Sequence, residues 1–406
     1  MRLLFLSDNF PPEVNAPATR TYEHCSEWVK DGFEVTVITC APNFPEGKVY
    51  SGYKNSWKKE EWVNGIRVIR VWSYITANEG FFKRILDYIS YSITAFLAGL
   101  FIKCDIIIAT SPQFFTALAG QALAFWKTKP WIMEVRDLWP ESIKTVGAIN
   151  DGFVYHFLEW LELRLYRSAT KIVTVTETFK KSIVVRGIDG DKIEVIKNGA
   201  NLILFTPRER NQTIINELKL SGKFVISFIG TIGLAHKLSF ILESASKIKD
   251  SSIHFLIVGS GAEKRNLEYL VQSLKLTNIT ILDKVAKELV PEYLSVSDVC
   301  LINLKRSETF KTVIPSKIFE SSAMAKPILL GVDGEAREIL ESYSAGLFFE
   351  PENEQDLIEK IYLLKNNHVL YEQCKTGCLK LAKDFDRKKL AAKMSVLFRG
   401  LASTKQ

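Results

Sequence analysis

Two glycine-containing loops in the second half of the chain could bind a phosphate group. Gly230 and Gly233 follow an apolar stretch and let the backbone approach a ligand closely, and Lys237 at the next helix start offers a point charge. The second loop begins at Gly259 but has Lys264 at the third glycine position of a dinucleotide-binding GxGxxG sequence, so it is a weak sign of NAD. No GxxxxGK sequence occurs, which excludes a P-loop nucleotidase.

A third group of polar residues lies further along the same half. Ser316 is expected to cap a helix whose first turn carries Lys317 and Glu320. A lysine and a carboxylate at this position could bind the phosphates and the ribose hydroxyl groups of a nucleotide. On spacing alone, the two side chains could equally be solvated groups at a helix end.

In the first half, charged residues follow apolar strands, where open parallel sheets bind their ligands. Glu134, Arg136 and Asp137 stand at the end of a buried strand. Glu134 or Asp137 could act as a base or orient a substrate, and the alternative is a structural ion pair with Arg136. The long loop at 7–17 feeds a helix, so its amides could bind an anion or substrate, or it could be a plain connection.

One segment, residues 81–103, is the most lipophilic of the chain. Its apolar run at 89–102 is too short to span a bilayer and fits an interfacial or buried helix. Aromatic and basic residues at its ends would meet anionic headgroups, and they are Phe81, Phe82, Lys83, Arg84 and Lys103. We expect docking on a membrane surface, with an ordinary core helix as the alternative.

These candidates are held by short apolar strands that alternate with amphipathic helices, which predicts doubly wound parallel sheets. The first series of expected strands is 3–6, 35–39, 67–71, 105–109, 131–135, 171–174 and 193–196, and the second is 224–229, 255–258, 280–282, 299–303, 327–331 and 347–350. A charged, proline-containing stretch separates the two series. We therefore expect domains at 1–203 and 204–384, with a final helix at 385–406 that crosses back onto the first.

Composition limits the class of protein. A chain of 406 residues is too long to fold around a single hydrophobic core. The content of 47% hydrophobic and 24% charged residues excludes a disordered protein. A net charge of +7 is too mild for a nucleic-acid partner, and no apolar run reaches the roughly 18 residues of a membrane span. The five histidines are scattered, and the Asp-x-Asp sequences at Asp189 and Asp384 lie in a turn and at a helix start, so no metal site is expected. We expect a cytoplasmic location.

Several motifs resemble those of family 4 glycosyltransferases, in the same order along nearly the whole chain. They are NGANLILFTP at 198–207, GSGAEKRNLE at 259–268, PSKIFE at 315–320 with KP at 326–327, GEAREIL at 334–340 and AGLFFEPEN at 345–353. The FPPE opening at 10–13 with Arg20, the EVRDLWPES stretch at 134–142 and the PSK motif resemble the L-fucosamine transferase type of bacterial surface-polysaccharide synthesis.

The resemblance implies a GT-B fold, with two facing Rossmann-like domains around an interdomain cleft. It implies a retaining, metal-independent transfer of a sugar, such as the N-acetylamino-deoxyhexose L-FucNAc, to a polyprenyl-diphosphate-linked glycan in O-antigen, capsule or exopolysaccharide synthesis. The nucleotide sugar, of UDP type, is a substrate, and no cofactor is implied. The enzyme would work peripherally on the inner face of the cytoplasmic membrane.

The resemblance also implies roles for individual residues. Donor binding falls to Gly230, Thr231, Gly233, Lys237, Gly259, Val285, Ser316, Lys317 and Glu320. Acceptor binding falls to Asn15, Arg20, Arg136 and Asp137. The catalytic residues would be Lys237 for the diphosphate, Glu320 for the ribose and Asp137 for orienting the acceptor hydroxyl.

Several positions depart from the family pattern, among them Lys197 and Ala200 in the hinge. Thr231 replaces the usual arginine, Thr312 replaces the first of two glutamates, and Ala325 stands where glycine is common. We expect Lys317 to supply the missing positive charge. Two rival hypotheses stay open, a non-hydrolysing UDP-sugar 2-epimerase and a non-catalytic membrane-surface assembly protein.

Overall fold

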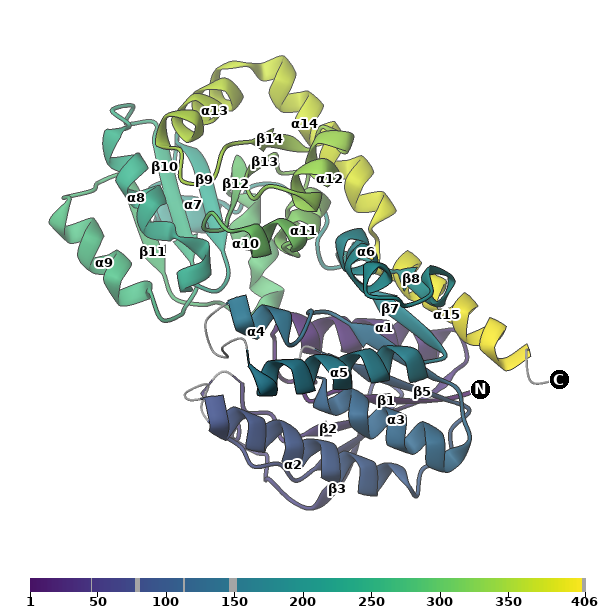
Figure 1. Ribbon diagram of the computed structural model, residues 1–406. Coiled ribbons are helices and arrows are strands. Elements are labelled where there is room, and N and C mark those ends of the chain that lie inside the picture. The colour runs from purple at the N-terminus through teal and green to yellow at the C-terminus, as the bar shows by residue number, and fades with distance from the viewer. Residues whose placement is uncertain (45, 77–80, 112–113, 146–151, 404–406) are drawn as a thin grey trace. The chain divides into compact units, whose positions relative to one another are not determined.

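The computed structural model describes residues 1–44, 46–76, 81–111, 114–145 and 152–403, with the backbone alone at positions 81, 82, 145 and 403. The chain divides into two compact units (Figure 1), the first formed by Met1–Lys197 and Arg387–Gln406 and the second by Asn198–Asp386. The division after Lys197 lies six residues before the expected boundary at 203. The terminal helix belongs to the first unit, although the chain passes through the whole second unit before reaching it.

The first unit is built on one sheet, which has eight strands among the described residues in the order β3-β4-β2-β1-β5-β6-β7-β8. All neighbours are parallel except β3 and β4. The strands are β1 (Arg2–Leu6), β2 (Glu34–Cys40), β3 (Lys58–Val63), β4 (Ile66–Val71), β5 (Ile106–Thr110), β6 (Trp131–Val135), β7 (Lys171–Thr174) and β8 (Ile193–Val195).

Helices cover both faces of this sheet. The helices are α1 (Ala16–Lys30), α2 (Phe81–Gly99), α3 (Phe115–Lys127), α4 (Glu141–Thr145), α5 (Phe153–Ser168), α6 (Glu177–Val185) and α15 (Arg387–Ser403), with a 3-10 turn η1 (Gly190–Lys192). Successive strand residues point to opposite faces. Accordingly Leu4 packs with α2, α3 and α5, whereas Phe5 packs with α1 and α15.

The second unit contains a fully parallel sheet with the order β11-β10-β9-β12-β13-β14 in the described chain. Its strands are β9 (Phe224–Ile229), β10 (Ile253–Val258), β11 (Ile279–Leu282), β12 (Val299–Asn303), β13 (Ile328–Gly331) and β14 (Gly346–Phe348). The strand order runs outward from β9 in one direction and from β12 in the other, so the reversal lies between these two strands.

Helices flank this sheet on both faces as well (Figure 1). They are α7 (Gln212–Glu217), α8 (Leu238–Lys247), α9 (Lys264–Ser273), α10 (Val290–Ser295), α11 (Lys317–Ala323), α12 (Glu335–Tyr343), α13 (Glu354–Asn366) and α14 (His368–Asp384), with 3-10 turns η2 (Leu234–His236), η3 (Lys287–Leu289) and η4 (Glu308–Thr312). Both units thus have the predicted α/β, Rossmann-like architecture.

The edge strand β3 was not predicted. Its sequence KKEEWV is charged and largely exposed, so it has no apolar run to reveal it. It pairs antiparallel with β4, and Arg67 of β4 binds Glu60 of β3 at 2.7 Å. Charged edge strands of this kind discourage pairing with other chains.

Candidate functional site

The predicted phosphate loop and Lys317 follow the two strands at which the second sheet reverses its order. The chain leaves β9 into residues 230–237 and leaves β12 into the segment before α11, and β9 and β12 are neighbours. Open α/β sheets bind ligands in the crevice at such a reversal. The fold therefore brings together two groups of residues that lie far apart in the chain.

Lys317 reaches under the phosphate loop. Its Nζ lies 3.6 Å from the centre of the Phe228 ring. A Cβ placed on Gly230 would lie 2.6 Å from the lysine Cε, so the side chain occupies the space that a larger residue at 230 would need. The Nζ is buried and has no hydrogen-bond partner among the described residues. Burial lowers the pKa of this lysine to about 7, against a weaker opposing effect of Glu320.

Gly259 has a structural reason for being glycine. A Cβ at this position would lie 1.8 Å from the carbonyl oxygen of Gly230, because the loops after β9 and β10 pack directly on each other. Ile232 donates its amide to Ser260 at 2.8 Å, which fastens the two loops together. Gly259 thus supports the phosphate loop, and its own contact with a donor stays a prediction.

The other predicted donor residues are spread around this loop. Lys237 and Thr231 are exposed, and Lys237 takes a left-handed backbone with φ 45° at the amino end of α8. Glu320 is half-buried one turn after Lys317 and lines a small cavity with it. Val285 follows the edge strand β11 and is half-buried. Lys317 and Glu320 of α11 therefore lie together, with Lys317 beneath the loop at 230–237, whereas Val285 follows the edge strand of the sheet.

The segment before α11 contains Ser316, which was predicted to cap the helix, and Thr312, which stands where the family has a glutamate. The predicted capping by Ser316 is wrong, because its side chain makes no capping hydrogen bond. Its φ of −60° and ψ of −22° are already helical, whereas capping residues have extended backbones. Thr312, which replaces the family's glutamate, donates its hydroxyl to the carbonyl of Thr309 at 2.8 Å.

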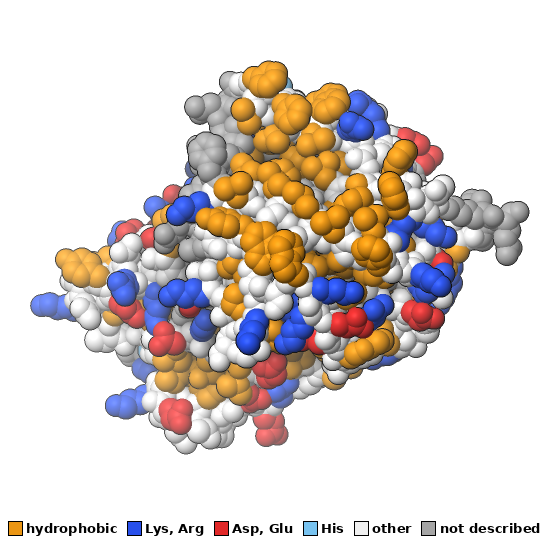
Figure 2. Space-filling model, turned by 90° about the horizontal axis from the view of Figure 1, so that it is seen from below, with side chains coloured by type: hydrophobic (Ala, Val, Ile, Leu, Met, Phe, Trp, Pro, Cys, Tyr) orange, Lys and Arg blue, Asp and Glu red, His pale blue; other side chains and the backbone are white. Residues whose placement is uncertain are grey.

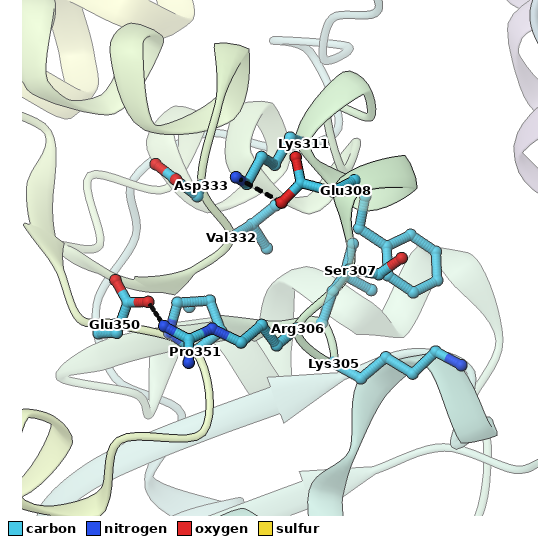
Figure 3. Close-up of a pocket in the computed structure, with 12 residues that line it drawn as sticks. Lys305, Arg306, Ser307, Glu308, Lys311, Val332, Asp333, Glu350 and Pro351 are labelled. Atoms are coloured by element: carbon cyan, nitrogen blue, oxygen red, sulfur yellow. Dashed lines mark hydrogen bonds and ion pairs between the residues drawn. The ribbon is translucent and has the colours of Figure 1, made fainter.

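Sequence analysis also missed a second cavity of the second unit, of about 240 Å³, at the carboxyl ends of β12, β13 and β14 (Figure 3). The charged groups on its walls largely pair with one another. Lys311 binds Glu308 at 2.7 Å, and Arg306 pairs with Glu350. The signal was present as a run of charges directly after a strand, but nothing in the run distinguished a cavity from a solvated turn.

In the first unit, Arg20 and Glu134 form a buried ion pair at 3.0 Å, each 2% exposed in its side chain. Arg20 also donates to the carbonyl oxygens of Lys197 and Ile196, at 2.9 and 3.0 Å. Burial alone would raise the pKa of Glu134, but Arg20 and Arg136 outweigh it and lower the pKa. These bonds hold Arg20 inside the unit as a positioning residue, and its predicted contact with an acceptor stays a prediction.

Arg136 and Asp137 lie half-buried just after β6. The Arg136 Nη1 is buried and has no hydrogen-bond partner among the described residues, and burial lowers the pKa of the guanidinium to about 10. Asp137 accepts a hydrogen bond from Ser142 Oγ at 3.0 Å, and burial raises its pKa. The expected alternative of a simple Arg136–carboxylate pair does not describe the geometry, since Glu134 bonds to Arg20 instead.

A cavity of the first unit, about 430 Å³, lies beside Asn15 at the carboxyl ends of β1 and β2. Asn15 caps α1 by accepting from the amide of Ala18 at 2.8 Å. Glu13 and Asp87 line the same cavity, and burial raises the pKa of each carboxyl group to about 7. Neither residue was predicted as part of a site. The loop at 7–17 was interpreted as a whole, without a role for Glu13, and the segment that contains Asp87 was interpreted only as a lipophilic helix.

The outer side of α2 continues into a broad apolar surface. The helices α2, α3 and α5 lie side by side, α2 against α3 and α3 against α5. Large exposed apolar side chains gather on these helices and on the turn after α2 (Figure 2), namely Leu86, Ile93, Leu97, Phe101, Phe125, Trp126, Phe153, Val154, Phe157 and Trp160. Lys83, Arg84 and Lys103 are exposed at its margins. The side chains of Phe81 and Phe82, which the sequence assigned to the same surface, lie outside what the structure describes.

Two kinds of feature are absent from the described residues. No helix in these ranges is both long enough and apolar enough to cross a bilayer. No three His, Cys, Asp or Glu side chains in the described part of the chain gather closely enough to hold a metal ion.

Family models match both units. Residues 15–199 match the glycosyl transferase 4-like domain, and residues 209–378 match the glycosyl transferases group 1. A relative from Escherichia coli K12, WcaI, named as a glycosyl transferase of colanic acid biosynthesis, is 23% identical over 92% of this chain and 95% of its own. A relative named as a glycosyltransferase, WbjE of Pseudomonas aeruginosa, is 28% identical over 49% of this chain and 50% of its own.

Solved structures match the fold over its whole length. Sucrose-phosphate synthase of Thermosynechococcus elongatus superimposes with a TM-score of 0.79 at 15% identity, covering 99% of each chain. HepE of Anabaena, solved with UDP-glucose, gives a TM-score of 0.72 at 13% identity over 98% of this chain and 100% of its own. With both units matched in order and the GT-B fold matched throughout, the chain belongs to the family 4 glycosyltransferases.

Proposed function

We propose that this glycosyltransferase moves a sugar from a nucleoside diphosphate to a lipid-linked glycan during synthesis of a bacterial surface polysaccharide. The donor is of UDP type and carries an N-acetylamino-deoxyhexose such as L-FucNAc, and the transfer is retaining and independent of metal. The names of WcaI and WbjE support the transfer reaction, and that of WcaI supports the polysaccharide pathway.

The observation that carries the donor side is the buried Nζ of Lys317 beneath Gly230. A buried ammonium group without a hydrogen-bond acceptor is costly unless a ligand supplies one. A diphosphate over residues 230–237 would supply it, with Lys237 as a second positive charge at the loop. Lys317 then fills the place of the arginine that Thr231 has replaced.

The chemistry follows from these charges. As the bond between the sugar C1 and the diphosphate oxygen breaks, negative charge grows on the leaving diphosphate, and Lys317 and Lys237 stabilise it electrostatically. The acceptor hydroxyl attacks from the side on which the diphosphate leaves, and its proton passes to the departing phosphate oxygen. Glu320 binds the ribose hydroxyl groups.

Asp137 orients the attacking hydroxyl in this proposal. Asp137→Asn keeps the shape of the side chain but removes its charge, so kcat should fall about a hundredfold while UDP affinity stays within twofold. Steady-state kinetics and calorimetry measure the two quantities. An unchanged kcat would remove Asp137 from the reaction.

The apolar surface of α2, α3 and α5 supports membrane docking, because such a large exposed apolar area with a basic margin fits the boundary between acyl chains and anionic headgroups. We expect the protein to float with phosphatidylglycerol vesicles and less with phosphatidylcholine vesicles. Trp126→Ser together with Phe125→Ser should lower the bound fraction severalfold. Trp62→Ser, an exposed tryptophan of the edge strand β3, serves as the control.

A donor screen tests the reaction itself. UDP- and dTDP-sugars are tested for thermal stabilisation of the protein, and those that stabilise it are incubated with polyprenyl-diphosphate-linked sugars. Release of nucleotide that requires the lipid acceptor supports the transferase. Conversion of the donor into its 2-epimer without acceptor would support the epimerase alternative, and donor binding without turnover would support the assembly-protein alternative.

A further inference from the structure

The cavity at the carboxyl ends of β1 and β2 has walls from three separate parts of the first unit. The loop after β1 contributes Asp8 and Glu13, the loop after β2 contributes Asn43 and Phe44, and α2 closes the remaining side. Its volume of about 430 Å³ falls within the range of about 300–1,000 Å³ that small-molecule sites occupy.

The helix α2 divides its side chains between this cavity and the apolar surface. Arg84, Asp87, Tyr88 and Tyr91 line the cavity, at spacings of three, one and three residues that share one face of a helix. The exposed apolar residues of α2, among them Ile93, point elsewhere. A ligand in this cavity would therefore be held by the same helix that we place against the lipid.

Glu13 gives the cavity a fixed wall. Its side chain is buried, with the residue 3% exposed, and its Oε1 accepts hydrogen bonds from the amides of Asn43 and Phe44 at 2.8 and 2.9 Å. These bonds fasten the loop after β2 to the loop after β1. The carboxyl group is thus held in place before any ligand binds.

Asp87 differs from Glu13 in its hydrogen bonding. It is half-buried, and no hydrogen bond reaches its carboxyl group from the described residues. Burial first, and then the neighbouring charge of Asp8, raise its pKa to about 7 against the opposing effect of Arg84. Its oxygens are therefore available as acceptors on the cavity wall.

The charges on the walls select the kind of ligand. Three carboxyl groups face one basic side chain, Arg84, whose guanidinium lies against Tyr88 at the exposed end of the helix. A diphosphate would be repelled by this set, whereas a neutral sugar can donate its hydroxyl groups to the carboxylates. Tyr88 and Phe44 add aromatic faces for the apolar side of a sugar ring.

We propose that this cavity binds a sugar residue of the acceptor glycan, whose hydroxyl groups donate to Asp87 and Glu13, and that it excludes the acceptor's diphosphate. The inference rests on the proposed function for the identity of the glycan. It assigns acceptor recognition to two carboxyl groups and to α2, in addition to Asn15 on the same wall.

The test measures binding of sugars to the full-length chain by saturation-transfer NMR. The probes are the methyl glycosides of glucose, galactose, N-acetylglucosamine and N-acetylgalactosamine, with inorganic pyrophosphate as competitor. We expect millimolar binding of at least one glycoside that pyrophosphate does not displace. Asp87→Asn should weaken this binding at least tenfold, and Glu34→Gln, an exposed acid at the opposite end of β2, should leave it unchanged.

The pH dependence separates recognition from a structural effect. Because an ionised carboxylate accepts hydroxyl hydrogen bonds best, glycoside affinity should rise about tenfold from pH 6 to pH 8 when a group with pKa near 7 titrates. The titratable and charged groups around the two carboxyls are Asp8, Cys40, Tyr50, Arg70, Arg84, Tyr88 and Tyr91. Asp87→Asn should reduce this rise, which a simple loss of packing would not do.

Two outcomes would overturn the inference. One is that no glycoside binds the wild-type protein, and the other is that pyrophosphate displaces the bound glycoside from the cavity. Calorimetry with UDP on the same samples reports on the second unit alone. Intact UDP binding with absent glycoside binding would reject the cavity proposal and keep the proposed donor site, and the reverse result would reject the donor site alone.

Discussion

The two units share the order of their central parallel strands, β4-β2-β1-β5-β6-β7 and β11-β10-β9-β12-β13-β14, but differ in the charged residues at the loops after their first strands. In the second unit, the loop after β9 carries glycines and a buried lysine reaches it from α11. In the first unit, the loop after β1 contributes the buried carboxyl group of Glu13 and the half-buried one of Asp8. The fold decides where the loops stand, and the residue types in them decide which ligand they suit.

Burial shifts the pKa of the basic group and of the acidic groups in opposite directions and brings both to similar values. It lowers the pKa of Lys317 to about 7 and raises the pKa of Glu13 and Asp87 to about 7. Each unit thus holds groups that are only partly charged near neutrality and that a suitable ligand would fully ionise. The expected ligands differ accordingly, an anion in the second unit and a hydroxyl-rich sugar in the first.

The largest expected effect comes from Gly259→Ala. Its new Cβ would lie 1.8 Å from the carbonyl oxygen of Gly230, so the two loops must move apart. We expect the free energy of unfolding to fall by about 2–3 kcal/mol and UDP binding to be lost. Gly233→Ala is the matched control for the free energy of unfolding alone, because its nearest neighbour, a methyl group of Thr231, lies at 3.8 Å and its φ is −117°. Denaturant unfolding measures the stability and calorimetry measures the UDP affinity, and an equal loss of stability in the two variants would contradict the packing argument.

Lys317→Met comes next. It removes the charge but keeps an apolar chain against Phe228, so UDP affinity should fall ten- to hundredfold, or about 1.5–3 kcal/mol. The same substitution should raise the free energy of unfolding. Because the pKa of Lys317 is lower in the folded chain than its ordinary 10.5, the charged form opposes folding below pH 7 and this cost fades as the pH rises to 10.5.

The methionine variant should therefore gain stability over the wild type at pH 6, with the gain shrinking at pH 9. Urea unfolding at the two pH values checks this. Lys284→Met, at an exposed position after β11, should change neither affinity nor stability. A loss of stability at pH 6 in Lys317→Met would mean that the lysine is held by contacts other than those described.

The smallest effect is the pH dependence of UDP binding. As the pH rises from 6 to 8, the free protein loses the proton of Lys317, so UDP affinity should fall up to tenfold. The phosphate groups of UDP also titrate, and this affects its binding to the wild type and to Lys317→Met alike. The quantity to compare is therefore the difference between the two proteins in how UDP affinity changes with pH. Glycoside affinity should change in the opposite direction over the same range, and parallel changes would remove the contrast between the units.

Much of the architecture could be predicted from the sequence, because buried parallel strands are short apolar runs. The segment at 224–229 is such a run, and β9 spans the same residues. The edge strand β3 could not be found this way, since only one of its faces contacts the protein and its residues are largely charged. Gly259 was interpreted as a ligand-binding glycine; the close contact of two backbones is a further reason for glycine that the sequence does not reveal, and the donor contact stays a prediction.

The site was predictable where its residues lie close together in the chain. Lys317 and Glu320 share one turn of α11, so their spacing alone placed them together. Glu13 and Asp87 could not be found, because their burial arises only when α2 packs beside the loops after β1 and β2. The role of Arg20 was hidden for the same reason, since its partner Glu134 stands on a distant strand.

The terminal helix α15 has a consequence for the order of assembly. Its Phe398 ring packs on Trp28, whose Nε1 donates to the carbonyl of Ala391 at 3.1 Å, and Arg387 pairs with Glu23. During synthesis, α1 and its side of the first sheet therefore stay uncovered until residues 387–403 have left the ribosome. The second unit is continuous in sequence and can complete its core earlier. The half of the enzyme that is made first is thus the half that finishes folding last.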